Sequence, residues 1–324
     1  MKRFWIIITI CTIGVVNAFS QSYSQFNHYF RTMAYYNPAY VGKTGDLNVH
    51  GLFRHQWAGF GSDSLSSGSP RSIFIAADMP WQYKKTQHGL GIVVVSEKVG
   101  LDDDMNISLQ YAYKKKVGKG ILSVGLQAGL MSKSFNGDKI EWLNSNDHQE
   151  EEDVEKAQTD AKGLDFALGL FYSTDKYYAG FASTRILEPT LKLTETMERK
   201  VSRGYNLTAG YNIQMRNPLI ELQPSLFVQM TSVMVVGDIT ARAVYNKMFN
   251  GGLGVRISDS GQFNAAILYL GATIKKFDIG YAYEFPTTKI IKASSGSHEF
   301  AVSYRLNLNK KQGEKNRHKS IRIL

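Results

Sequence analysis

Hydrophobic and polar residues alternate along most of the chain after residue 46. Between residues 106 and 113, for example, Asn, Ser, Gln and Ala alternate with Ile, Leu and two Tyr. Side chains on the two faces of a β-strand alternate with this period. The pattern predicts fourteen strands, near residues 47–58, 71–79, 89–96, 105–114, 121–134, 163–172, 177–183, 203–214, 219–230, 235–245, 249–257, 262–270, 276–285 and 297–307.

Two features of these strands favour a membrane barrel over a soluble β-sandwich. Several stretches have ten or more residues, whereas ordinary strands have about 5–6 residues and strands that cross a bilayer at a tilt have about 9–11. One face is uniformly large and apolar while the other is small and polar, as expected for a lipid face and a lumen. We therefore expect an all-β fold, a transmembrane antiparallel β-barrel of the outer membrane over residues 47–308.

Closing the barrel brings charged residues together inside it. Lipid offers no partners for backbone N–H and C=O groups, so the first predicted strand must pair with the last. On this seam Arg54 and Glu299 face the lumen by their position in the alternation, and Glu284 lies one strand further. We expect these three residues to form an ion-pair cluster in the lumen.

The predicted connections fall into long and short ones. Long connections are expected near residues 59–70, 97–104, 135–162, 184–202 and 286–296, and short ones near 115–120, 173–176, 215–218, 246–248 and 271–275. Outer-membrane barrels have short periplasmic turns and longer external loops. We therefore expect both termini in the periplasm and the acidic stretch 141–160 outside the cell. The Asp102-Asp103-Asp104 run is expected to be a turn between strands.

The first twenty residues resemble an export signal. Lys2 and Arg3 precede the apolar run 4–16, and small residues follow at 18–20, so cleavage is expected after Ser20 or after Ala18. The only cysteine, Cys11, lies inside this signal peptide, so the mature chain would carry none.

Two further segments flank the predicted barrel. Residues 21–46 are too aromatic for a free linker, and we expect a periplasmic segment that plugs the lumen or packs against the barrel base. Asn37-Pro38 would turn this segment towards the first strand. Residues 309–324 form a basic tail, either a solvated extension or a surface for an acidic periplasmic partner.

The charge distribution excludes one class of partner. The formal net charge is +10, but much of it lies in the tail and the rest is scattered. Nucleic-acid binding needs basic residues concentrated on one face, so we expect none. The acidic stretch 141–160 is either a solvated loop or a site for a divalent ion or partner, because clustered carboxylates suit hard cations. It lacks the spacing of an EF-hand.

The chain lacks the common catalytic motifs. It has no Gly-x-Ser-x-Gly nucleophile elbow and no His-x-x-x-His metal spacing. Gly42-Lys43-Thr44 resembles the end of a phosphate-binding loop, but position 37 is Asn where that motif has Gly. We expect no enzymatic activity, no catalytic or metal-binding residues and no cofactor.

A series of short motifs resembles one known family, the PorP/SprF outer-membrane proteins of the type IX secretion system. The resemblance covers Gln25 to Leu308. It rests on residues 25–29, on Asn37-Pro38-Ala39-Tyr40, on Gly51 to Trp57 with Arg54, Gln56 and Trp57, on 89–92 and 98–100, and on His298-Glu299-Phe300.

This resemblance implies a non-enzymatic role in secretion. Family members look like fourteen-stranded barrels that help to export or retain large surface proteins, including gliding adhesins, by holding the cargo's C-terminal secretion domain. It also implies a periplasmic partner, a type IX secretion or peptidoglycan-binding lipoprotein, beside the surrounding outer-membrane lipid. Two alternatives remain open. One is a passive channel or transporter for small or hydrophobic solutes, and the other is a structural protein that holds peptidoglycan through its tail.

Overall fold

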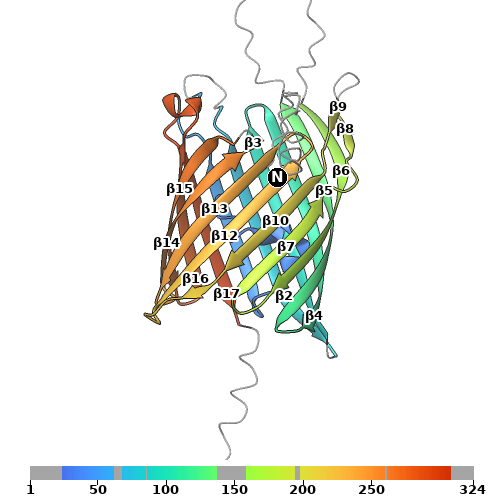
Figure 1. Cartoon of the computed structure of the whole chain (residues 1–324). Helices are drawn as coiled ribbons and strands as arrows, with labels where there is room; N and C mark the ends of the chain where they lie inside the picture. The colour runs from blue at the N-terminus through green and yellow to red at the C-terminus, as the bar shows by residue number, and fades with distance from the viewer. Residues whose placement is uncertain are drawn as a thin grey trace, which may run out of the picture.

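The computed structural model describes residues 24–61, 68–84, 86–136, 158–193, 198–259 and 261–307 (Figure 1). Nearly all regular structure in these ranges is strand. The wall of the barrel consists of β1 (Leu47–His55), β2 (Arg71–Tyr83), β3 (Thr86–Val99), β4 (Asp102–Val117), β5 (Gly120–Asn136), β6 (Gln158–Ser173), β7 (Tyr177–Thr184), β10 (Gly204–Tyr211), β11 (Ile213–Gln214), β12 (Ile220–Thr231), β13 (Val235–Tyr245), β14 (Phe249–Ser258), β15 (Phe263–Ile274), β16 (Phe277–Pro286) and β17 (Ser297–Leu306).

These strands close into a single antiparallel barrel. Each wall strand pairs with its neighbours in sequence, β10 pairs with both β7 and β12, and β1 pairs with β17. The two-residue β11 continues β10 after one residue and pairs with β12, so the two form one wall strand and the barrel has fourteen. The predicted fold and its seam between the first and last strands are confirmed.

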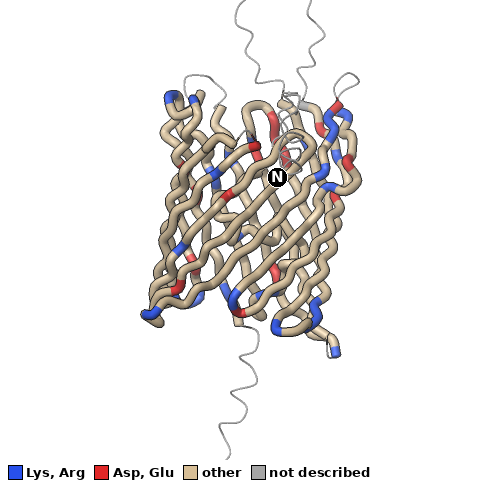
Figure 2. Tube along the Cα trace, in the orientation of Figure 1, with Lys and Arg blue, Asp and Glu red and all other residues tan. Residues whose placement is uncertain are grey.

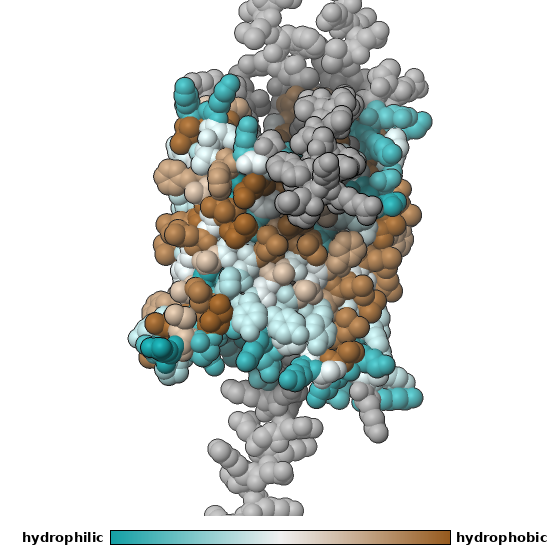
Figure 3. Space-filling model, in the orientation of Figure 1, coloured by the Kyte–Doolittle hydropathy of each residue, from teal (hydrophilic) through white to brown (hydrophobic). Residues whose placement is uncertain are grey.

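The two faces of the wall have opposite chemistry. Leu109, Leu130 and Leu253 point outward and are 64%, 62% and 68% exposed, while Ser108 and Gln110 point inward and are buried. Apolar side chains surround the middle of the barrel and polar ones gather at its ends (Figure 3). This is the distribution that a lipid-facing barrel requires. Within the described residues, no helix is long and apolar enough to cross a membrane.

Two expectations about connections are wrong. The stretch 97–104 is not a long loop, because β3 runs to Val99 and β4 starts at Asp102, with Gly100 at φ 59° in the tight turn. Asp102 to Asp104 are therefore residues of β4 and not a turn. Lys98 pairs with Asp103 at 2.7 Å across the hairpin, and Lys133 pairs with Asp104. The backbone ladder continues here although the apolar alternation has ended.

Residues 24–46, the N-terminal segment, lie inside the barrel. This segment contains the short helix α2 (Met33–Tyr36) and the 3-10 turn η1 (Pro38–Tyr40). The barrel has one end with the longer connections, the long-connection end, and one with the short turns, the short-turn end. Ser24 donates its hydroxyl to Glu97 near the long-connection end, and Gly42 donates its N–H to Asp78 towards the short-turn end. Residues 24–46 therefore run through the barrel, and Ser24 and Asn307 lie near opposite ends of it.

The longest described connection between wall strands, residues 185–203, carries its own small hairpin. Strand β8 (Thr190–Lys192) pairs with β9 (Glu198–Lys200). Leu191, Leu193 and Val201 from this connection bury against Met131 and Ala161 of the wall. A further 3-10 turn, η3 (Lys289–Lys292), lies in the connection between β16 and β17.

Candidate functional site in the lumen

Aromatic residues of the N-terminal segment fill the middle of the lumen. Phe26, Tyr29 and Tyr36 have no exposed surface. Tyr29 stacks on Phe227 of β12 with ring centroids 5.2 Å apart, and Tyr36 packs against the same ring at 4.4 Å. Burying each such ring stabilises the packed state by about 1.5–3 kcal/mol. The segment is therefore part of the barrel's core and closes its centre.

The Asn37-Pro38-Ala39-Tyr40 motif docks this segment onto β6 and β7. The Asn37 side chain donates from Nδ2 to the carbonyl oxygens of Leu170, at 2.9 Å, and Phe181, at 3.3 Å. Its Oδ1 accepts the Ala39 N–H at 2.9 Å, while Pro38 begins the 3-10 turn. The Asn37 amide thus forms hydrogen bonds with both the wall and the 3-10 turn, and Asn37 is fully buried.

The wall opposite this motif is made of glycine. A Cβ on Gly169 would lie 2.1 Å from Asn37 Oδ1, and a Cβ on Gly125 would lie 2.1 Å from the Ala39 nitrogen. Neither distance is possible for a real side chain. The motif can pack this closely only against glycine, since any larger residue at Gly169 or Gly125 would clash with it and displace it from the wall.

Glu299 holds the start of the segment. Its carboxylate accepts the backbone N–H groups of Asn27, at 2.8 Å, and His28, at 2.7 Å, and the His28 Nδ1 at 2.7 Å. Burial lowers the pKa of His28 despite the adjacent carboxylate, which favours a neutral ring that donates Nδ1–H. A carboxylate with several N–H donors is a strong acceptor, so Glu299 acts as a clamp on residues 27–28.

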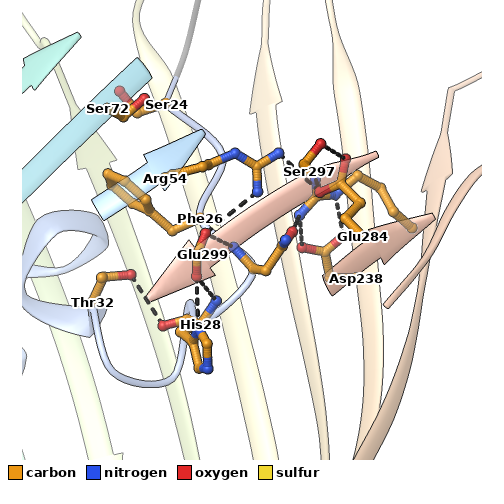
Figure 4. A network of polar contacts seen from close by, with 12 residues as sticks. Ser24, Phe26, His28, Thr32, Arg54, Ser72, Asp238, Glu284, Ser297 and Glu299 are labelled. Atoms are coloured by element: carbon orange, nitrogen blue, oxygen red, sulfur yellow. Dashed lines mark hydrogen bonds and ion pairs between the residues drawn. The ribbon is translucent and has the colours of Figure 1, made fainter. Parts of the chain in front are cut away.

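Glu299 belongs to a buried network of charges (Figure 4). Arg54 donates to Glu284 at 2.8 Å and to Glu299 at 3.4 Å. Arg256 also donates to Glu284, at 3.0 Å, and its Nε binds Asp238 at 2.7 Å. Arg54, Glu284 and Glu299 are thus brought together in the lumen. Because each charge has a partner of opposite sign, the cost of burying it is offset.

Two members of this network, Arg256 and Asp238, were not predicted from the sequence. They face each other in the register of β13 and β14, and both point inward by the same alternation that singled out Arg54. Arg256 also donates to the Asn27 side chain at 3.0 Å, so the network grips the N-terminal segment at a second point. Both residues could have been found by searching each predicted strand for charged residues on its inward face.

Three other motif residues lie at the long-connection end and outside the network. Gln56 donates its backbone N–H to Pro70, and Trp57, at φ 51°, donates its backbone N–H to Ser297. The His298 ring bonds to the Tyr281 hydroxyl at 2.8 Å. These contacts shape the barrel's rim.

Several expectations fall outside the described residues. They are the signal peptide, nearly all of the acidic stretch 141–160 and the tail 309–324. Among the residues that the structure does describe, no group of three or more His, Cys, Asp or Glu side chains could hold a metal ion.

Comparisons with known proteins agree with this architecture. The family model described as "Type IX secretion system membrane protein PorP/SprF" matches residues 18–304. No curated protein sequence matches the chain.

Two solved structures are similar in fold. A Pseudomonas aeruginosa FadL homologue aligns with a TM-score of 0.50 and 10% identity, covering 86% of this chain and 94% of that one. The Ralstonia pickettii toluene transporter TbuX aligns with a TM-score of 0.52 and 12% identity, covering 85% and 93%. At these identities the likeness shows a shared barrel fold.

Proposed function

Because the chain belongs to the PorP/SprF family of type IX secretion system membrane proteins, we propose that it assists the export and surface anchoring of a cargo protein, such as a gliding adhesin. It does so by binding the cargo's C-terminal secretion domain. The family match over residues 18–304 carries this proposal.

The packed lumen supports an anchor rather than a conduit. Residues 26–41 fill the middle of the barrel with buried aromatic rings, and the charges around Glu299 are paired. A cargo domain would then be held at a barrel mouth and not threaded through it. The end with the connections 56–70, 185–203 and 287–296 has the longer connections, and the opposite end is left for a periplasmic lipoprotein partner.

Site-specific photocrosslinking tests this assignment. A photoreactive phenylalanine at Ile291, in η3 of a long connection, should crosslink to the C-terminal domain of a large secreted protein in intact cells. The control is the same substitution at Met248, in a short turn, because the two side chains are 49% and 44% exposed. A second test position is Leu187, in the connection 185–203. Equal cargo crosslinking from Ile291 and Met248 contradicts the proposal, and so does the absence of cargo crosslinking from both Ile291 and Leu187.

A second candidate function is a passive channel or transporter for small or hydrophobic solutes. One observation favours it: the fold is similar to that of a toluene transporter. An apolar groove of about 580 Å³ also lies on the outer, lipid-facing side of the wall between β3 and β6, lined by Leu109, Leu126 and Phe166. A channel also requires the N-terminal segment to leave the lumen, and conductance measurements distinguish the two functions.

A further inference from the structure

The short-turn end of the lumen contains a polar cavity of about 420 Å³ below the N-terminal segment. Residues 42–45 line one side of it, and residues of β2 to β6 line the rest. Two lysines line it: Lys43 from the segment and Lys114 from β4. Gln82, Gln87, Ser123 and Ser173 supply further donors.

The Lys114 side chain is buried in the wall, and it lines this cavity. It is only 6% exposed, and it makes no hydrogen bond or ion pair with any residue that the structure describes. Asp78, the nearby carboxylate, already accepts the Gly42 N–H at 2.7 Å and lies 3.5 Å from His50. The ammonium therefore faces the cavity with no direct ion pair, and an anion that enters the cavity can pair with it.

The second lysine is held in position by aromatic rings. The Lys43 ammonium lies 5.4, 5.0 and 4.9 Å from the ring centroids of Tyr40, Phe171 and Tyr178. Such cation–π contacts orient an ammonium without neutralising it. Lys43 therefore presents its ammonium group to the same cavity.

The mouth of this cavity is also positively charged. Figure 2 shows basic residues along the short-turn end of the barrel. The described turns and strand ends there carry four acidic residues, Asp46, Asp175, Glu221 and Asp278, beside the basic residues Lys84, Lys115, Lys116, Lys119, Lys176, Arg216, Lys247, Lys275 and Lys276. A rim with an excess of one sign raises the local concentration of ions of the other sign.

We propose that the cavity between Lys43 and Lys114 binds a phosphate group that enters from the short-turn end. Two lysine point charges with hydroxyl and amide donors around them suit a tetrahedral, multiply charged oxyanion, whereas planar carboxylates are better matched by the bidentate fork of arginine. The volume exceeds that of inorganic phosphate, so the group would be part of an organic phosphate. Its source is either a soluble phosphate ester or a phospholipid headgroup.

Calorimetry on the purified, detergent-solubilised protein tests the soluble source, with glycerol phosphate as the probe. Native mass spectrometry with added phosphatidylglycerol tests the lipid source. Lys114→Gln and Lys43→Gln should each weaken binding by about tenfold, as expected for the loss of one charge-assisted contact. Lys98→Gln is the control, because this exposed lysine lies near the end of β3 at the long-connection end, away from the cavity and its rim. It should change binding less than twofold.

Three results would overturn the proposal. They are no binding of either probe by the wild-type protein, equal losses from Lys98→Gln and Lys114→Gln, and Lys114-dependent binding of a polyglutamate peptide without phosphate binding. The Lys114→Gln variant removes an unpaired buried charge and is expected to fold, which heat-dependent migration in gels checks. These results are independent of cargo crosslinking at Ile291.

Discussion

Glu299 shows how much of this molecule depends on single buried residues. Its carboxylate joins the barrel wall to the N-terminal segment through Asn27 and His28, and joins the first strand to the last through Arg54. It is fully buried, so its charge is stable only while these donors stay in place. A residue with this role couples closure of the barrel to closure of the lumen.

Replacing Glu299 by Gln should release the N-terminal segment. The neutral amide accepts fewer hydrogen bonds and leaves Arg54 less well neutralised, so docking should weaken by about 3–5 kcal/mol, as for a broken buried ion pair. The measurement is the rate of trypsin cleavage at Arg31 and Lys43 in the folded, detergent-solubilised barrel.

The matched control is Glu198→Gln, which breaks an exposed pair with Lys192 at 3.1 Å. Exposed pairs contribute about 0–1 kcal/mol, so this variant should be cleaved like the wild type. Unchanged protection in Glu299→Gln would show that aromatic packing alone holds the segment.

At the scale of elements, the strands are longer than their apolar alternation. The predicted strand 105–114 is Asp102–Val117 in the structure, and 163–172 is Gln158–Ser173. Alternation reports contact with lipid, whereas a strand is defined by its hydrogen-bonded ladder, which continues into water. Hydropathy therefore located the wall strands well and their ends poorly, and it gave no sign of the β8–β9 hairpin.

The position of the N-terminal segment predicts that two introduced cysteines can form a disulfide between it and the wall. An ideal Cβ on Gly91 lies 3.3 Å from the Val41 Cβ, close to the usual disulfide separation of about 3.5–4.5 Å. The double variant Val41→Cys/Gly91→Cys should therefore crosslink on mild oxidation. The only native cysteine, Cys11, lies in the expected signal peptide.

Mass spectrometry of peptides and free-thiol counts would measure this bond. The pair Val41→Cys/Gly237→Cys is the control, since Gly237 lies on β13 and Gly91 on β3. If the control pair crosslinks as well as the test pair, the segment does not occupy one fixed position.

At the scale of the whole molecule, the closed wall and the filled lumen have the same physical cause. A barrel in lipid must leave no open edge, and its inward polar side chains then need partners that water would otherwise supply. The N-terminal segment supplies many of them: Gln110 donates to the Ala34 carbonyl, and Asn206 donates to the Tyr36 carbonyl. The segment's backbone therefore accepts hydrogen bonds from polar side chains of the wall, while its aromatic rings fill the centre of the lumen.

Conductance in planar bilayers measures this closure. The wild-type protein should pass little current, and a variant lacking residues 24–44 should conduct at least severalfold more, because a barrel of this size is open once unplugged. Glu299→Gln gives a milder opening if the deletion variant fails to fold. Steady, large currents from the wild type would support the channel function instead.

The sequence by itself determined the barrel, its fourteen wall strands and the inward direction of Arg54, Glu284 and Glu299, because alternation is a local property that lipid enforces on every strand. Only the tertiary structure decided what the lumen contains. The seat of Asn37 against Gly125 and Gly169, the clamp from Glu299 to His28 and the unpaired Lys114 all join residues far apart in the chain. Such contacts depend on strand register and on the path of the N-terminal segment, and neither has a period that can be recognised in the sequence.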